Sequence, residues 1–273
     1  MSIDNVNLTS GMFNNLISLQ SIQGQINTTQ EQMSTGKKVN SALDDPTSYF
    51  SAQSELQRAS DLSNRQNGMS ESVQTIQAAN AGISGITSLI QSAQGLASSA
   101  ASTNNTLSQA TYYSQYLQIQ TQISEMASDS GYQGTNLLTQ GTLTIQFGQQ
   151  SGTSQLTVNG VDSTNTGLGV TSVGTWQDGT GLAAQSDSAC MDTALTTLRA
   201  DSSTLASNLS IITARQSFTT SLINTLQTGA NNLTLADMNE VSANMLQLQT
   251  QQSLGTTALS LSSQAAQSVL KLF

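Results

Sequence analysis

Apolar residues recur along the first part of the chain at the spacing of one face of an α-helix. The stripe advances by four, three, three, four and seven positions through Met12, Leu16, Leu19, Ile22, Ile26 and Met33. Such steps place the side chains along one side of a helix. Ser34, Thr35 and Gly36 then favour a helix end, because glycine adopts the left-handed conformation that closes many helices. The pattern predicts an amphipathic helix ending near residue 36.

The next segment predicts a connector over 37–46, followed by a long helix. Asp44, Asp45 and Pro46 resemble a helix start, since Asp caps a helix N-terminus and proline suits the first helical position. The helix predicted from about Thr47 to Ser102 is too long for an ordinary globular helix. Its apolar positions are Val73, Ile76, Ile83, Ile86 and Ile90.

A third helix and a hairpin follow. The helix, from about Ser108 to Ser128, has a heptad seam at Tyr112, Tyr116, Ile119, Ile123 and Met126. Between residues 131 and 185 the pattern of apolar positions changes from a helical repeat to a repeat of two residues. Apolar and polar residues alternate over 143–147 and again over 156–158, on either side of a loop over 148–154, which predicts a β-hairpin. Trp176 is interpreted as a local packing anchor.

Helical periodicity returns in the last third of the chain. One helix, from about Ser186 to Thr228, carries the stripe Met191, Leu195, Leu198, Ser202, Leu205, Leu209 and Ile212, and Gly229 to Thr234 is predicted to interrupt it. The last helix, about Leu235 to Leu272, carries two stripes. They are Val241, Met245, Leu248, Leu259, Ala266, Val269 and Phe273, and Leu254, Leu261, Ala265 and Leu272.

Two stripes on one helix imply neighbours on more than one side. At ~1.5 Å per residue this helix is ~55 Å long, so one chain of 273 residues cannot cover both stripes. Polar interruptions at Gln252, Gly255 and Ser262 weaken its own seam, and we expect it to be completed only on assembly. The fold class predicted is mainly α: long antiparallel helices forming a terminal coiled coil and a helical rod, with a small β-hairpin.

Composition removes several classes of function. The chain has no histidine, which excludes triads, His-ligated metals and imidazole proton shuttles, and its net charge of -9 with seven basic residues disfavours nucleic acid. We expect no enzyme activity, no cofactor and no metal.

Cys190 is the single cysteine of the chain and is interpreted as a small, buried or half-buried residue. Charged residues make up 8% of the chain against ~25% in globular domains, which suits surfaces that pack on copies of themselves.

No segment approaches the ~20 apolar residues that span a bilayer, and Met1 to Gly11 lacks the basic start and apolar block of a secretory signal. We therefore expect no membrane insertion and no Sec-type export.

Both ends of the chain and most of its middle resemble the bacterial flagellins. The resemblance rests on Gln32 to Ala42 with Asp44 to Pro46, on Gln118 to Leu138, and on three C-terminal runs: Ala236 to Met238, Leu246 to Gln252, and Leu254 to Leu270. The return to helix within about fifty residues is similar to short flagellins that lack a large outer domain.

The resemblance implies a filament subunit with six segments. They are 1–36 and 229–273 for the inner tube, 37–46 for the connector, 47–136 and 186–228 for the rod, and 137–185 for the hairpin region. It implies inter-subunit packing by Leu16, Leu19, Ile22, Ile26, Met245, Leu248, Leu254, Leu259, Leu261, Val269 and Leu272. The connector would act through Lys37, Lys38, Asp44, Asp45 and Pro46.

Partners implied by the resemblance are other flagellin copies, the filament cap, hook-associated proteins, a secretion chaperone and the flagellar type III export apparatus. The protein would reside in the extracellular flagellar filament.

Some flagellins activate an innate immune Toll-like receptor through a Leu-Gln-Arg-x-Arg-Glu-Leu patch. The matching positions here are Ile90, Gln91, Ser92, Ala93, Gln94, Gly95 and Leu96. Both arginines and the glutamate are missing, so we expect weak or no activation.

Two alternatives stay open at this stage. A hook–filament junction protein shares the terminal helices, and a periodic but disordered exported adhesin would share the composition. The first predicts a capped product that does not elongate, and the second predicts low helicity even in the polymer.

Overall fold

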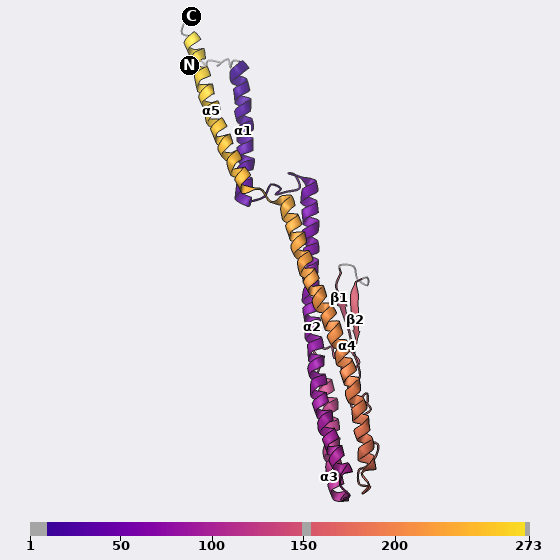
Figure 1. The fold of residues 1–273 in the computed structure, drawn as a ribbon. Coiled ribbons are helices and arrows are strands. Elements are labelled where there is room, and N and C mark those ends of the chain that lie inside the picture. Colours follow the sequence, from indigo (N-terminus) through magenta and orange to yellow (C-terminus); the bar gives the residue numbers. More distant parts are fainter. Residues whose placement is uncertain (1–9, 149–153, 271–273) are drawn as a thin grey trace. The chain divides into compact units, whose positions relative to one another are not determined.

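The computed structural model describes residues 10–148 and 154–270, with the side chains of Val269 and Leu270 left out. These residues form five helices and one two-stranded sheet (Figure 1). In chain order they are α1 (Ser10–Thr35), α2 (Pro46–Ala101), α3 (Thr106–Asp129), β1 (Thr142–Gln146), β2 (Gln155–Asn159), α4 (Leu182–Thr234) and α5 (Met238–Leu270). The chain divides into unit 1, residues 1–57 and 225–273, and unit 2, residues 58–224.

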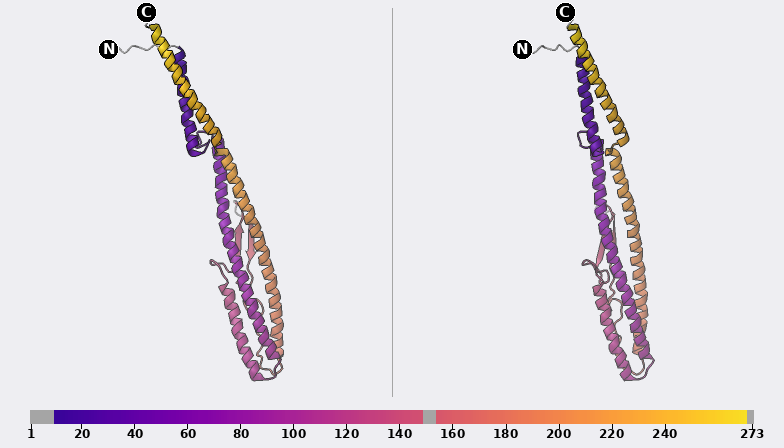
Figure 2. Two further views of the ribbon diagram at one scale, coloured as in Figure 1. Left: turned by 60° about the vertical axis from the view of Figure 1, so that its left-hand side comes forward. Right: turned by 90° about the vertical axis from the view of Figure 1, so that its left-hand side faces the viewer.

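Unit 2 is an antiparallel bundle of the long parts of α2 and α4 with α3 alongside (Figure 2). Side-chain hydrogen bonds join α2 and α4 along their length. Residue numbers increase along α2 as they decrease along α4, which shows that the two helices are antiparallel. The pairs are Gln66 with Thr220, Ser70 with Gln216, Asn80 with Ser202, and Gln94 with Asp192. The predicted stripes of all three helices face one continuous core, with Ile76, Ile90, Ile123 and Leu198 fully buried. The mainly α fold is therefore confirmed.

The hairpin was predicted from its alternation, and the pairing of β1 with β2 confirms it. The strands run antiparallel with Ile145 opposite Leu156 and Leu143 opposite Val158. Ile145, Phe147 and Val158 are buried against the helices, whereas the intervening threonines are exposed. The predicted loop over 148–154 lies mostly outside the described residues.

A buried aromatic group fixes the segment that leads into α4. Trp176 is fully buried and its ring stacks on Tyr116 with centroids 4.6 Å apart. Its indole Nε1 donates to Oδ2 of the buried Asp187 at 2.7 Å, and the Val173 amide donates to Oδ1 at 2.8 Å. Burial raises the pKa of the Tyr116 phenol above its ordinary value. The packing role predicted for Trp176 is thus what the structure shows.

Many Ser and Thr hydroxyls inside the helices donate to the carbonyl oxygen four residues earlier. Examples are Ser72 to Gly68, Thr87 to Ile83 and Thr204 to Ala200, at 2.7 to 3.0 Å. These bonds satisfy the hydroxyls locally, so a helix rich in Ser and Thr needs no partner for them.

Two predicted boundaries of α4 are wrong. The helix does not stop at Gly229: Leu226 and Ala230 on either side are buried, and their packing offsets the ~1 kcal/mol that an internal glycine costs. The break falls instead at residues 235–237, because the backbone there bonds with the segment after α1: Ala236 N donates to Gly36 O and Lys38 N to Thr234 O.

The other boundary of α4 lies four residues before the predicted one. Asp178 accepts from the amides of Thr180 and Gly181, and this turn leads directly into the helix at Leu182. The remaining helices begin and end within about three residues of the predicted positions.

We expect Asp187→Ala to lower the free energy of unfolding by about 2 to 4 kcal/mol, because the buried Trp176 N–H and the partly buried Val173 amide both lose their acceptor. Urea unfolding of the monomer, followed by the fluorescence of Trp176, measures the change. The control is Asp192→Ala, an exposed acid on the same helix, for which we expect about 0.5 kcal/mol or less. Equal effects from the two variants would contradict the anchoring role.

Candidate interaction surfaces

In unit 1, α1 and α5 form an antiparallel pair with a thin core. Ile26, Met245 and Leu248 are buried together, with Ile22 packed against them. Farther along the pair, Gln252 Nε2 donates to Gln23 Oε1 at 2.8 Å, and a Cβ built at Gly255 would lie 2.7 Å from Leu19. Glycine thus lets the helices approach closely at that point.

The same two helices leave large apolar side chains in solvent. On α1 the exposed fractions of Phe13, Leu16 and Ile17 are 55%, 39% and 49%, and on α5 those of Leu246, Leu254 and Leu261 are 67%, 65% and 61%. A helix buries one face against one partner, so a pair of helices leaves the other apolar faces uncovered. Apolar surface of this kind marks an interaction site.

The residues predicted to pack between copies fall into three groups. Ile26, Met245 and Leu248 are buried within the pair, Leu19, Ile22 and Leu259 are half-buried, and Leu16, Leu254 and Leu261 are exposed. Val269 lies in α5, but its side chain is outside the described residues, as is Leu272 altogether. Sequence reasoning missed Phe13, Ile17 and Leu246, although the step of four from Phe13 to Ile17 was a readable helical signal.

The connector is ordered by its two aspartates. Asp44 Oδ2 accepts from the amides of Asn40 at 2.9 Å and Ser41 at 2.8 Å. Asp45 caps α2, since its Oδ1 accepts from the Thr47 and Ser48 amides and its Oδ2 from the Ser48 hydroxyl. Pro46 is the first residue of α2.

The side chains of Lys37 and Lys38 are exposed, and both residues are fixed through hydrogen bonds of their backbone. Lys37 pairs with Leu235 in an antiparallel bridge. Gly36, at the end of α1, has a φ of 70°, which directs the chain into this bridge. The connector is therefore fastened to the junction between α4 and α5.

Hydrogen bonds lower the pKa of both aspartates. Those from the backbone of Ser41 and Asn40 act on Asp44, and those from the side chain and backbone of Ser48 act on Asp45. Each carboxylate therefore favours the folded connector at neutral pH.

The segment matching the receptor patch lies on α2 in unit 2. Gln91, Ser92 and Gly95 are exposed, Gln94 and Leu96 are half-buried, and Gln94 Nε2 donates to Asp192 on α4. The exposed side chains of this segment are therefore short or neutral.

Other kinds of site find no support in the described residues. Among residues 10–148 and 154–270, no three His, Cys, Asp or Glu side chains lie where they could hold a metal ion. In that same part of the chain, no helix has both the length and the apolar character to cross a membrane. Cys190 is half-buried, as predicted.

Long amphipathic helices with uncovered apolar faces are typical of proteins that polymerise, and comparison with known proteins agrees. The family model of the bacterial flagellin N-terminal helical region matches residues 6–142, and that of the C-terminal helical region matches residues 189–273. The chain belongs to the bacterial flagellin family.

Individual flagellins are similar over different lengths. Flagellins FljM and FljK of Caulobacter vibrioides are 29% and 28% identical over 274 aligned residues, which cover the whole of both chains in each case. Flagellin A of Rhizobium meliloti is 39% identical over 83 residues, 30% of this chain and 21% of its own. A crystal structure of Bacillus cereus flagellin has a TM-score of 0.49 and 19% identity, covering 56% of this chain and 88% of its own.

Flagellins are structural proteins and not enzymes. This chain is accordingly a structural subunit of the bacterial flagellar filament, where it polymerises with other flagellin copies in the extracellular propeller used for motility.

We expect the Asp44 carboxyl to titrate below the ordinary pKa of 3.8 in the folded protein. Since the folded pKa is the lower one, its contribution to connector stability is present above pH 3.8 and is lost as the pH falls through the folded pKa. Carboxyl-carbon NMR of the monomer measures this, with the same signal in urea as the reference. A folded midpoint at or above the reference would contradict the capping role.

Proposed function

We propose that the outward faces of α1 and α5 are the surfaces through which copies pack into the inner wall of the filament. The observation that carries this proposal is the exposure of Leu246, Leu254 and Leu261 on a helix whose opposite side already holds the buried Met245 and Leu248. Leu254 and Leu261 are one heptad apart and lie on one face of α5, so a single neighbouring helix can cover both.

The energy available is adequate for association. Burying a leucine side chain fully contributes about 1.5 to 3 kcal/mol, so three leucines contribute about 5 to 9 kcal/mol before the cost of association is subtracted. Only the excess appears as affinity, and each subunit must therefore be held by several neighbours. A polymer supplies those neighbours because its contacts are heterologous and do not close into a ring.

The predicted division of the chain follows the same reasoning. Residues 1–36 and 229–273 would line the inner tube, and residues 47–136 and 186–228 would form the rod outside it. The connector, 37–46, would hold its conformation through Asp44 and Asp45 while Lys37 and Lys38 face an adjacent subunit. The hairpin region, 137–185, would complete the outer surface.

We also propose that the chain leaves the cell unfolded through the flagellar type III export apparatus, with a secretion chaperone, and that it meets the filament cap and hook-associated proteins outside. The composition supports this route. One proline and one cysteine mean that refolding outside the cell largely avoids both proline isomerisation and disulfide formation, which are slow steps.

Replacing both Leu254 and Leu261 with Asn should abolish elongation on filament seeds, because two exposed apolar contacts of the outer face of α5 are lost. Sedimentation and electron microscopy measure the polymer, and circular dichroism checks that the monomer keeps its helices. The matched control replaces the exposed Gln249 and Gln264 of the same helix with Asn and should elongate as the wild type does. Normal elongation of the leucine variant would refute the proposed packing.

The monomer should stimulate the Toll-like receptor weakly or not at all in a reporter-cell assay, since Ser92 and Gln94 lack the planar donor group of arginine. The control introduces Ser92→Arg, Gln94→Arg and Gly95→Glu together and should raise the signal. Full stimulation by the unaltered monomer would contradict this expectation.

A further inference from the structure

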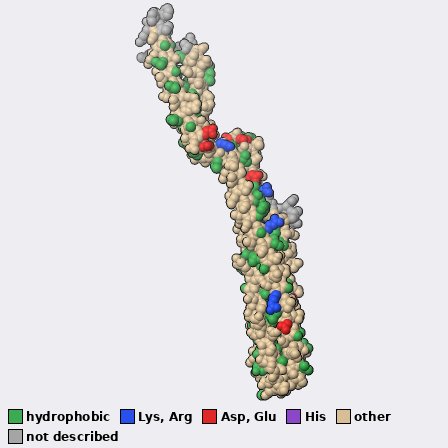
Figure 3. Space-filling view, viewed as in Figure 1, with side chains coloured by type: hydrophobic (Ala, Val, Ile, Leu, Met, Phe, Trp, Pro, Cys, Tyr) green, Lys and Arg blue, Asp and Glu red, His purple; other side chains and the backbone are tan. Residues whose placement is uncertain are grey.

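Charge is unevenly distributed within unit 2. Residues 66–198 contain seven acidic residues and no lysine or arginine. Residues 58–65 and 208–224, which lie by the hairpin, contain Arg58, Arg65 and Arg215 against the single acid Asp61. On the face drawn in Figure 3, basic side chains lie beside the hairpin, and none lies at the end of unit 2 where α3 begins. The two ends of the unit thus differ in chemistry.

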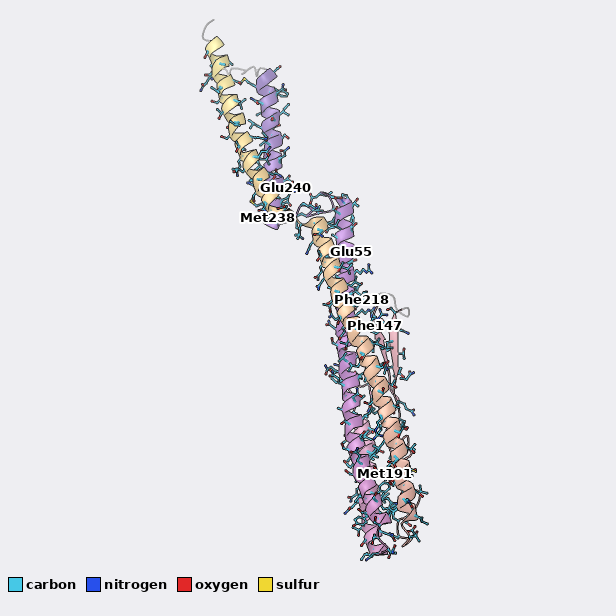
Figure 4. All side chains as sticks on the ribbon, viewed as in Figure 1. Glu55, Phe147, Met191, Phe218, Met238 and Glu240 are labelled. Atoms are coloured by element: carbon cyan, nitrogen blue, oxygen red, sulfur yellow. The ribbon has the colours of Figure 1, made fainter. Side chains whose placement is uncertain are left out.

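A groove lies at the basic end, which we call the arginine–phenylalanine groove. It has a volume of about 130 Å³ and is lined by Arg58, Leu62, Phe147, Gly148, Ser154, Arg215, Phe218, Thr219 and Leu222. Arg215 lies over the Phe147 ring, with its guanidinium carbon 5.2 Å from the centroid, and Phe218 is 58% exposed at the rim (Figure 4). A dry cavity on the order of 150 Å³ holds a benzene molecule, so this groove can take one apolar side chain.

The opposite end of unit 2 carries a tip formed by Leu107 in the first turn of α3, Leu182 at the start of α4 and Asp178 in the turn that leads into α4. Leu107 is 76% exposed and Leu182 is 65% exposed. The backbone at Gly179 and Gly181 packs on residues 101–106, which places the starts of α3 and α4 side by side.

Asp178 is an exposed anion at this tip. Hydrogen bonds from the side chain and amide of Thr180 and from the amide of Gly181 lower the pKa of Asp178 to about 2, so the carboxylate is ionised at neutral pH.

We propose that the tip of one copy, Leu107, Asp178 and Leu182, docks in the arginine–phenylalanine groove of a second copy. The tip offers leucines and a carboxylate, and the groove offers aromatic rings and two guanidinium groups, so apolar surface and charge are both complementary. Leu182 and Phe218 are about 54 Å apart along α4 at ~1.5 Å per residue, so a tip cannot reach its own groove. The contact is therefore head-to-tail, and in a filament, where such contacts do not close into a ring, it can repeat from copy to copy.

This inference rests on the proposed function, because it names a second contact of the same polymer, between rods and apart from the faces of α1 and α5. It also gives the groove residues a role that the fold does not require, since Arg215 and Phe218 are both exposed.

Charge reversal tests the docking. Arg215→Glu should raise the critical concentration for elongation on wild-type seeds about tenfold, because it places a second acid against Asp178. Adding Asp178→Lys to the same chain should restore most of the loss. The control, Arg199→Glu, reverses an exposed arginine on the same helix outside the groove and should change the value by about twofold at most. Equal effects at positions 199 and 215 would overturn the docking.

Cross-linking tests it without depending on how Asp178→Lys folds. The native cysteine is first removed with Cys190→Ala. Filaments of a chain that also carries Leu182→Cys and Phe218→Cys are then treated with a short bismaleimide, and we expect a ladder of cross-linked multimers. Either substitution alone, or Leu182→Cys with Arg199→Cys, should give no ladder. If the variant with both Leu182→Cys and Phe218→Cys forms intact filaments but gives no ladder, the docking proposal is refuted and the proposed function is not. If the unaltered chain forms no filaments, the proposed function and the docking fall together.

Discussion

The constraint on which this molecule depends is the small amount of apolar surface that two helices can hide from water by themselves. The pair of α1 and α5 buries Ile26, Met245 and Leu248 in a single thin seam and leaves leucines of α5 more than half exposed. Hydrophobic burial is the main favourable term in folding, and this pair obtains only part of it. The proposed packing on other copies would supply the rest, and the folding of the chain ends and the growth of the polymer would then be parts of one process.

Unit 2, in contrast, covers its apolar core with its own residues. Its three helices share a continuous core, and the hairpin and the segment around Trp176 close the remaining sides. The buried Asp187 satisfies two N–H donors there, which replaces the water that a loop would otherwise need. One chain thus combines a bundle whose core is complete in the monomer with a pair of helices whose apolar faces are only partly covered.

The sequence predicted the helices well because their stripes are long and regular, and it predicted the hairpin because strict alternation over 143–147 is typical of a strand with one buried face. It failed where tertiary contacts override local signals. Gly229 looked like a helix end, but buried neighbours hold the helix through it, and the break at residues 235–237 comes from backbone pairing with the segment that follows α1.

Periodicity also could not say which predicted packing residues face inward. Leu248 and Leu254 lie on two different stripes of the last helix, and the sequence does not say which stripe faces α1. In the structure Leu248 is buried within the pair and Leu254 is exposed, because the packing of α1 against α5 determines which face is covered. The arginine–phenylalanine groove was out of reach for the same reason, since Phe147 and Arg215 come from a strand end and a helix far apart in the chain.

The hydroxyl bonds inside the helices carry a mechanical consequence. A Ser or Thr hydroxyl that bonds the carbonyl four residues earlier tends to bend the helix slightly at that point. Such bonds recur along α2 and α4, so flexural compliance is spread over the length of each helix and is not concentrated at one hinge. A propeller loaded by viscous drag could then curve through many small deformations, each too slight to break a contact between neighbours.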